Sequence, residues 1–170
     1  VWLRHGLPGA LLGLLCLAHP EMRLMLEASL EGFLTNPVKY VSLALFILAA
    51  LIAYIGVIDR AIDARAVAWI LYALAISVWE EWVFRLAVPY FAQAQGFNLF
   101  AAIVLANLAF GVLHYFTLRW KWQWCLGAFV GGMLFSRMLH THADLALVIG
   151  VHWISTFLNT PRPPGGARRQ

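Results

Sequence analysis

The chain contains apolar stretches long enough to cross a lipid bilayer, and this feature restricts its fold more than any other. Residues 41–58 carry no charged side chain and are followed directly by Asp59 and Arg60. A helix needs about 20 apolar residues to cross the hydrocarbon core. Only 12% of the residues are charged, whereas soluble domains are about one quarter charged. The sequence therefore predicts an all-α integral membrane protein.

Further stretches of the same kind predict a bundle of five or six transmembrane helices. After the span at 41–58, they cover residues 66–90, 97–118, 122–139 and 143–158. Residues 7–18 are apolar but short, and form either a sixth span or a re-entrant or interfacial segment. The span at 122–139 contains Gly127, Gly131 and Gly132, which suit close helix packing.

The segment 20–38 has a different character, because charged residues alternate with large apolar ones. Glu21, Arg23, Glu27 and Glu31 stand among Leu, Met and Phe residues. This pattern is typical of an amphipathic helix that lies at the membrane interface. We therefore expect an N-terminal interfacial helix in front of the span at 41–58.

The distribution of basic residues predicts the orientation of the bundle. If residues 7–18 span the membrane, eight Lys and Arg side chains lie on one side of it and two on the other. The side rich in Lys and Arg is normally cytoplasmic, which places the C-terminus in the cytoplasm. Residues 1–160 then form a single domain, and the Pro/Gly-rich basic tail 161–170 is expected to be disordered. Topology accounts for the net charge of +4, so no nucleic-acid partner is indicated.

Three charged residues interrupt the span at 66–90. Glu80, Glu81 and Arg85 lie where an ionisable group costs about 2.5–3.5 kcal/mol, so such residues are functional candidates. Glu81 and Arg85 are four residues apart, carboxylate first, and are expected to form an ion pair along one helix face. Glu80 then has no local cation, which makes it a candidate general base or acid.

A second polar residue is expected to lie at the depth of Glu80. The sequence QAQGFN at 93–98, with Gly96, predicts a turn between two antiparallel helices. Glu80 and His114 are each 17 residues from position 97, so both lie about 25 Å from this turn. His152 lies near the middle of the last span at a compatible depth.

A glutamate and two histidines that converge in a membrane cavity are consistent with a hydrolytic site. Glu80 and His114 would hold and deprotonate a water molecule, while His152 would stabilise the oxyanion. The same residues are also compatible with a polar cluster that only joins helices, or with an ion or proton pathway. The spacing alone leaves these three alternatives open.

Three motifs in this region resemble those of the CPBP intramembrane proteases, which include the CAAX-type prenyl endopeptidases and bacteriocin-processing proteins. EEWVFR at 80–85 is similar to their E-E-x-x-x-R motif, and FGVLH at 110–114 to their F-x-x-x-H motif. A Gly-rich helix, a short turn and a final helix with His152 follow in the same order. The resemblance covers residues 66–160, which it identifies as the core of a transmembrane protease domain.

The resemblance implies a role for each motif residue. Glu80 would activate water with the help of His114, and His152 would stabilise the oxyanion. The supporting residues would be Glu81, Arg85, Phe110, Thr156 and Asn159. The family's last motif is H-x-x-x-N, whereas this chain has Thr156 at the final position. Either the Thr156 hydroxyl or the Asn159 amide would replace the missing asparagine.

The resemblance also implies the cofactor status and the substrate class. No H-E-x-x-H motif is present, and a glutamate-type mechanism without a metal is expected. If zinc were bound, its ligands would be Glu80, His114 and His152. The expected substrate is a membrane-anchored protein, cleaved at a C-terminal sorting tail or leader in a bacterial inner membrane. Alternatives are a catalytically idle immunity or binding protein and a proton-coupled transporter.

Overall fold

The computed structural model describes residues 2–58 and 62–160, and its regular elements in these ranges are all helices. They are η1 (Trp2–Gly6), α1 (Leu7–Cys16), α2 (Pro20–Ser29), α3 (Glu31–Thr35), α4 (Pro37–Ile58), α5 (Ala64–Glu81), η2 (Trp82–Ala87), α6 (Val88–Ala94), α7 (Leu99–Thr117), α8 (Trp122–His142) and α9 (Leu145–Asn159), where η denotes a π-helix. The all-α prediction is confirmed. The tail 161–170, for which disorder is predicted, lies outside the described residues.

Three helices are long and apolar enough to cross a membrane. They are α4, the continuous 31-residue helix Ala64–Ala94, which joins α5, η2 and α6, and α7. The apolar helix α9 is shorter, with 15 residues. Residues Leu3–Cys16 and Pro20–Ser29 form a pair bent by 106°, which is the geometry of a broken span or re-entrant loop. The described residues thus provide three candidate spans, or four if the bent pair counts as one, whereas the sequence predicted five or six.

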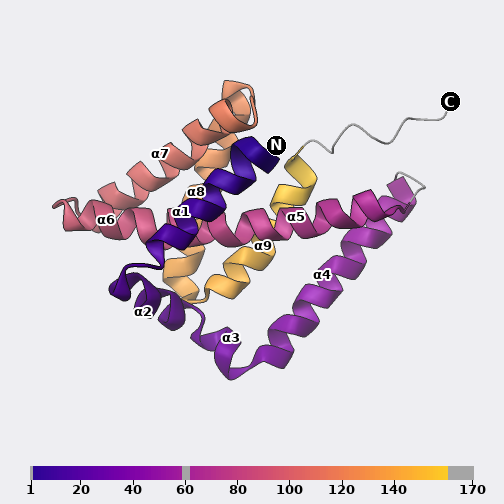
Figure 1. The fold of residues 1–170 in the computed structure, drawn as a ribbon, viewed down its shortest axis with the longest axis horizontal. Helices are drawn as coiled ribbons and strands as arrows, with labels where there is room; N and C mark the ends of the chain where they lie inside the picture. The colour runs from indigo at the N-terminus through magenta and orange to yellow at the C-terminus, as the bar shows by residue number, and fades with distance from the viewer. Residues whose placement is uncertain (1, 59–61, 161–170) are drawn as a thin grey trace.

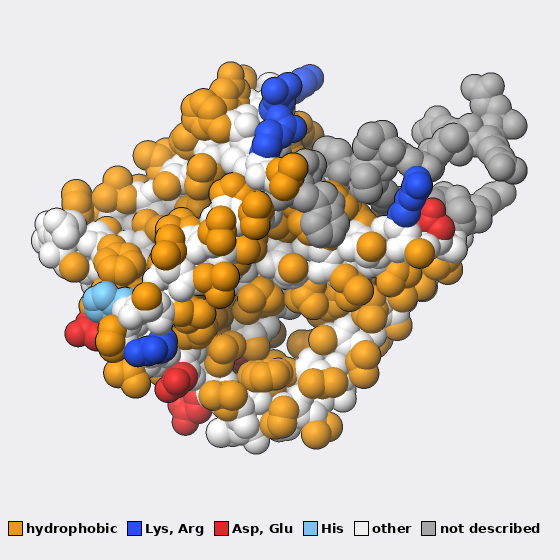
Figure 2. All heavy atoms as spheres, viewed as in Figure 1, with side chains coloured by type: hydrophobic (Ala, Val, Ile, Leu, Met, Phe, Trp, Pro, Cys, Tyr) orange, Lys and Arg blue, Asp and Glu red, His pale blue; other side chains and the backbone are white. Residues whose placement is uncertain are grey.

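The outer surface of the bundle is apolar, as a lipid-facing surface requires. Large side chains of α4 and α7, including Phe46, Val57, Phe100 and Phe116, are more than two-thirds exposed. Figure 2 shows hydrophobic side chains over most of the visible face, with charged groups near its margins. This distribution is consistent with an integral membrane protein.

Helix α5 runs through the centre of the molecule, and the other helices pack around it (Figure 1). On one side it packs with α4 and α9 through an apolar cluster that includes Ile47, Ile70, Trp153 and Phe157. Its continuation η2 lies in a second apolar cluster, which includes Met22, Val83 and Val148. The last turn of α5 thus lies between two packed apolar regions.

The predicted turn at 93–98 joins α6 and α7. Gly96 has a φ of +92°, a left-handed conformation that glycine adopts without steric cost. The Asn98 side chain then accepts a hydrogen bond from the Ala101 amide and caps the start of α7. As predicted, the two helices fold back on each other, which carries α7 towards the depth of Glu80.

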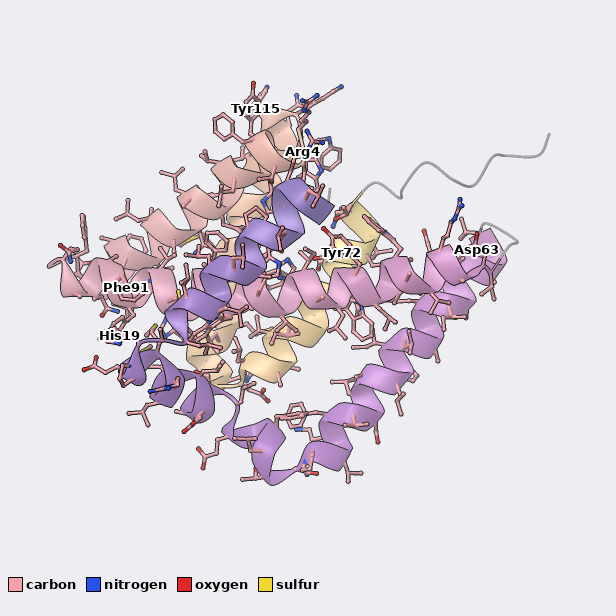
Figure 3. All side chains as sticks on the ribbon, viewed as in Figure 1. Arg4, His19, Asp63, Tyr72, Phe91 and Tyr115 are labelled. Atoms are coloured by element: carbon pink, nitrogen blue, oxygen red, sulfur yellow. The ribbon has the colours of Figure 1, made fainter. Side chains whose placement is uncertain are left out.

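The predicted interfacial helix at 20–38 consists of two short helices, α2 and α3, which meet at Leu30. The start of α2 is attached to α6, because Tyr90 donates a hydrogen bond to Glu21 and the His19 ring contacts the Phe91 ring. Figure 3 shows His19 and Phe91 together at the left of the molecule and Arg4 near its top. The segment η1–α1 therefore lies along the bundle and carries residue 5 towards the centre of α5.

Candidate active site

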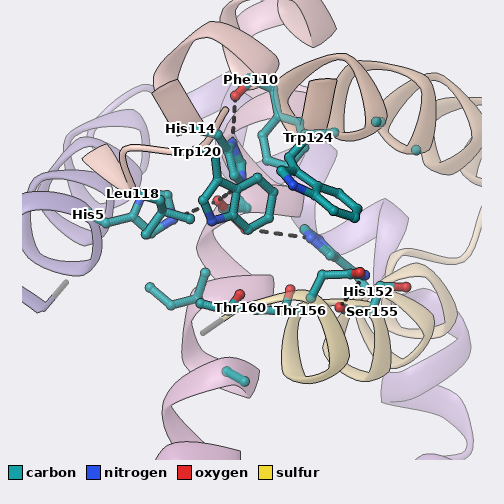
Figure 4. A pocket seen from close by; sticks show the side chains of 18 of the residues that line it. His5, Phe110, His114, Leu118, Trp120, Trp124, His152, Ser155, Thr156 and Thr160 are labelled. Atoms are coloured by element: carbon teal, nitrogen blue, oxygen red, sulfur yellow. Dashed lines mark hydrogen bonds and ion pairs between the residues drawn. The ribbon is translucent and has the colours of Figure 1, made fainter. Parts of the chain in front are cut away.

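Four ionisable side chains from four different helices meet at the end of α5 (Figure 4). His5 Nε2 lies 3.0 Å from Glu80 Oε1, and His114 Nε2 lies 3.9 Å from the same oxygen. His152 Nε2 approaches the other oxygen, Oε2, to 3.6 Å. All four residues are buried. The structure thus brings together Glu80, His114 and His152, and it adds His5.

The backbone changes its winding directly after the two glutamates. Residues Trp82–Ala87 form a π-helical segment, η2, within the long helix Ala64–Ala94. Such segments are rare and occur frequently at functional sites, because the wider turn redirects the side chains around it. In this protein the π-helical segment directly follows Glu80 and Glu81, and so lies next to the point where the three histidines approach Glu80.

Glu81 belongs to a network that also contains Arg85, the only Arg or Lys that the described residues place against the two glutamates. Arg85 Nε donates to Glu81 Oε2 at 3.0 Å, as the four-residue spacing predicts. Arg85 Nη1 donates to Asn107 Oδ1 at 2.7 Å, and Asn107 donates in turn to Ser136 Oγ at 3.0 Å. The guanidinium also lies 4.8 Å from the centre of the Phe110 ring. These contacts join α5, η2, α7 and α8.

His152 connects the two glutamates, since its Nδ1 lies 2.6 Å from Glu81 Oε1. One turn later on α9, the Thr156 hydroxyl lies 3.1 Å from Ser77 Oγ. Ser77 uses its own proton for the Ala73 carbonyl, so Thr156 is the donor in this pair. The Asn159 side chain is exposed and donates to the carbonyl of Ser155. Both candidates for the missing asparagine therefore have hydrogen-bond partners.

A cavity of about 270 Å³ adjoins the four residues and is lined by His5, Glu80, His114 and His152. Trp120, Trp124, Ser155, Thr156, Asn159 and Thr160 form further parts of its wall. The cavity provides room for a water molecule and for part of a substrate next to the glutamate.

The glycines of α8 behave differently from the prediction that they allow close helix packing. A Cβ added to Gly132 would collide with the Asn107 side chain, so this glycine does permit close packing. A Cβ on Gly127 or Gly131 would meet no atom within 4 Å, and both glycines line the cavity. The packing prediction is therefore wrong for these two, which instead leave open space above the glutamate.

A family model describes the same part of the chain. The model for Rce1-like type II CAAX prenyl endopeptidases matches residues 62–158, which is more than half of the chain. The chain belongs to this family. No curated protein and no solved structure matches it. Glu80, Glu81, Arg85, His114 and His152 all lie in the matched region of this protease family.

His5 lies outside the part of the chain that matches the endopeptidase family, and the sequence prediction missed it. The ring is held on both sides, by Glu80 and by a 2.9 Å hydrogen bond from Nδ1 to Thr117 Oγ1. The one sequence feature that could have indicated His5 is its position directly before the apolar stretch 7–18. It reaches membrane depth because the helical segment begins at Trp2 rather than at residue 7.

The other histidine pair of the sequence lies away from this site. His140 and His142 are in the last turn of α8, and both are exposed. Neither lines the cavity. The candidate site therefore rests on the cluster around Glu80.

Proposed function

We propose that this member of the endopeptidase family hydrolyses peptide bonds within the membrane, with Glu80 and His114 as the pair that activates water. One observation carries the proposal: a buried glutamate, contacted by three histidines, lies at a cavity. Glu81, its equally buried neighbour, is bound to Arg85. Glu80 has no such cation and is therefore the carboxylate available for proton transfer.

In the proposed reaction, a water molecule in the cavity attacks the carbonyl carbon of the substrate while Glu80 accepts its proton. Glu80 then returns this proton to the amine of the leaving peptide as the carbon–nitrogen bond breaks. His114 Nδ1 donates to the carbonyl of Phe110 at 2.8 Å, which orients the ring towards Glu80. The water is therefore placed between an oriented imidazole and the carboxylate.

His152 is proposed to stabilise the negative charge on the carbonyl oxygen. Its Nδ1 lies 2.6 Å from Glu81 Oε1, and its Nε2 lies 3.6 Å from Glu80 Oε2. For this role Nε2 has to donate a hydrogen bond as well, so the ring must carry both protons. The carboxylate of Glu81 at 2.6 Å compensates that charge. Glu81 and Arg85 thus support the proposed oxyanion site through His152.

The proposed substrate is a membrane-anchored protein that is cleaved near a C-terminal sorting tail or a leader, in a bacterial inner membrane. The apolar exterior and the family support a substrate that reaches the cavity from the bilayer. The open wall at Gly127 and Gly131 gives space for a large side chain beside the cleaved bond. We place the C-terminus in the cytoplasm on the basis of the basic loops, and no metal or other cofactor enters this scheme.

The test compares the native host carrying the wild-type gene with hosts carrying Glu80→Gln or His114→Ala. Mass spectrometry of the termini of membrane proteins is expected to find one or more proteins that are processed in the wild type and intact in both variants. Glu27→Gln, a change on the exposed face of α2, serves as the matched control and keeps processing. Identical termini in all four strains would refute the protease function and favour an idle binding protein or a transporter.

A further inference from the structure

The N-terminal segment η1–α1 packs on the part of the long helix that carries the glutamates. A Cβ added to Gly9 would collide with the Trp79 ring, so the glycine allows a close approach of α1 to α5. One turn further on, Trp82 Nε1 donates a 2.9 Å hydrogen bond to the Gly13 carbonyl. His5, Gly9 and Gly13 follow one another at four-residue intervals and therefore share one face of the segment. That face lies against α5 and η2.

His5 extends from this face to the candidate active site, where both of its ring nitrogens are in contact (Figure 4). Nδ1 forms a 2.9 Å hydrogen bond with Thr117 Oγ1 at the end of α7, and Nε2 lies 3.0 Å from Glu80 Oε1. The ring centre lies 5.5 Å from those of His114 and Trp79. Because His5 is only 5% exposed, solvent does not screen these contacts.

A second contact of Thr117 determines which nitrogen of His5 carries a proton. The Thr117 hydroxyl has one proton, which it donates to the Leu113 carbonyl at 2.7 Å. Its oxygen therefore accepts from His5, so His5 Nδ1 is protonated. In a neutral ring, Nε2 would then present a lone pair to Glu80 Oε1, and two buried acceptors would face each other without a proton. A second proton on the His5 ring removes this conflict.

Glu80 lies closer to His5 than to either of the other two histidines. The shortest distances to a carboxylate oxygen are 3.0 Å for His5, 3.6 Å for His152 and 3.9 Å for His114. Glu80 Oε1 makes no hydrogen bond of good alignment with a described residue, so its contact with His5 is an ion pair that depends on the charge of the ring. A doubly protonated His5 supplies that charge.

A carboxylate needs such a contact in order to point in one direction. Rotation about the last bond of a glutamate side chain has only broad preferences, so neighbouring groups decide where its two oxygens lie. Arg85 performs this task for Glu81. His5 is placed to perform it for Glu80, because it holds one carboxylate oxygen from a helix other than α5.

We propose that His5 is a positioning residue for Glu80, whose carboxylate it orients towards the attacking water and His114. This role rests on the proposed hydrolysis, in which Glu80 begins as a carboxylate and the proton between the two residues therefore resides on His5 Nε2. His5 keeps both ring protons throughout, and Glu80 alone takes a proton from the water and returns it to the leaving amine. His5 lies outside the family-matched residues, so the N-terminal segment of this chain supplies the contact.

The first test measures cleavage of a substrate identified from the host, with full-length variants reconstituted in liposomes. His5→Phe keeps an aromatic ring but has no nitrogen for Glu80. Its kcat is expected to fall about 10²-fold, the effect of misplacing a reacting group by about 1 Å. KM is expected to stay at the wild-type value, since the contact orients Glu80 rather than the substrate. His5→Gln offers an amide N–H donor in place of Nε2 and is expected to have a higher kcat than His5→Phe.

The second test addresses the other side of the ring. Thr117→Val removes the acceptor for His5 Nδ1, so its kcat is expected to lie between those of the wild type and His5→Phe. Thr117→Ser keeps the hydroxyl and is the matched control, with a wild-type kcat. His19→Ala removes a histidine that contacts Phe91 instead, and it is the control for the N-terminal segment. Thermal unfolding of each variant verifies that it is folded.

A third measurement needs no substrate. Nuclear magnetic resonance of nitrogen-15-labelled histidine, in purified protein at neutral pH, is expected to show protons on both ring nitrogens of His5. The signals of His5 are identified by their absence from His5→Phe. In Glu80→Gln the Nε2 proton is expected to be lost, because the counter-charge that retains it has been removed.

A wild-type kcat in His5→Phe would overturn the proposal, and so would a His5 ring without a proton on Nε2. If Glu80→Gln is inactive in the first case, the proposed hydrolysis stands without a role for His5. A protein that cleaves nothing although His5 carries both protons would refute the hydrolysis itself. The ion pair between His5 and Glu80 would then only join two helices.

Discussion

Glu80 and Glu81 are adjacent in the sequence and equally buried, and His152 contacts both, yet their other charged neighbours differ. Glu81 has a fixed cation in Arg85, which Asn107 holds in place. Glu80 has histidines on both oxygens and an adjoining cavity. Successive residues of a helix point about 100° apart, so one turn can present one carboxylate to a packed interior and the other to a site. Glu81 is thus the carboxylate bound to arginine, and Glu80 is the one for which we propose proton transfer.

The largest effect on stability is expected on the Glu81 side. Glu81→Gln leaves the Arg85 guanidinium buried without its counter-charge, which costs about 3–5 kcal/mol for a buried pair. We expect a loss of this size in the free energy of unfolding, measured by denaturant titration of the purified protein in detergent. Glu27→Gln on exposed α2 is the control and is expected to match the wild type. A wild-type value for Glu81→Gln would show that the two glutamates do not differ in this way.

His152 contacts both glutamates, so its removal distinguishes a role in catalysis from a role in helix packing. His152→Ala removes the proposed donor to the oxyanion, and loss of one such donor slows catalysis about 10²–10³-fold. We expect a decrease of this size in the cleavage rate per folded molecule, while the protein still unfolds cooperatively. His140→Ala, at the exposed end of α8, is the matched change outside the site. A cleavage rate close to wild type in His152→Ala would assign the residue to helix packing alone.

The cavity beside Glu80 can be filled without disturbing Glu81. Gly131→Leu places a side chain where a Cβ meets no atom within 4 Å, so it is expected to leave folding intact and to exclude substrate. The cleavage rate of a substrate with a large residue at the cut is expected to fall about 10–200-fold. Val130→Leu, on the exposed face of the same helix, adds volume towards lipid and is the control. Equal rates for the two variants would mean that the substrate does not occupy this space.

The smallest effect on stability and on the cleavage rate is expected for a change of Thr156, the position at which the resembled motif has asparagine. Thr156→Val removes the proton donated to Ser77, a hydrogen bond with a net contribution of about 0.5–1.5 kcal/mol. We expect a loss of that size in the free energy of unfolding and a smaller loss of cleavage than for His152→Ala. Thr141→Val, at an exposed position of α8, is the control, since the hydroxyl of Thr141 donates to the Arg137 carbonyl of its own helix. A larger loss of cleavage than for His152→Ala would make Thr156 the principal oxyanion donor.

Local spacing predicted the parts of this site that lie on one helix or one hairpin. The four-residue interval between Glu81 and Arg85 places them on one face, and the turn at Gly96 sets His114 opposite Glu80. Both follow from the constant rise of a helix between fixed points. The division into a glutamate that pairs with arginine and one that does not could therefore be predicted from the sequence.

The remaining features depend on packing between distant segments and could not be predicted in this way. His5 meets Thr117 across 112 positions of sequence, and its place depends on how η1–α1 lies against the bundle. The π-helical turn at Trp82–Ala87 has no local sequence rule. The glycines of α8 indicated close packing, but only the tertiary structure distinguishes Gly132 from the two that face the cavity.

The most direct measurement of the difference between the glutamates is the cleavage rate of Glu80→Gln, compared with its thermal stability. Wild-type and variant protein are reconstituted in liposomes with a substrate identified from the host, and the products are quantified by mass spectrometry. We predict a cleavage rate about 10²–10⁴-fold below wild type, as for loss of a general base, in a protein that remains folded. Cleavage by Glu80→Gln at the wild-type rate would contradict it.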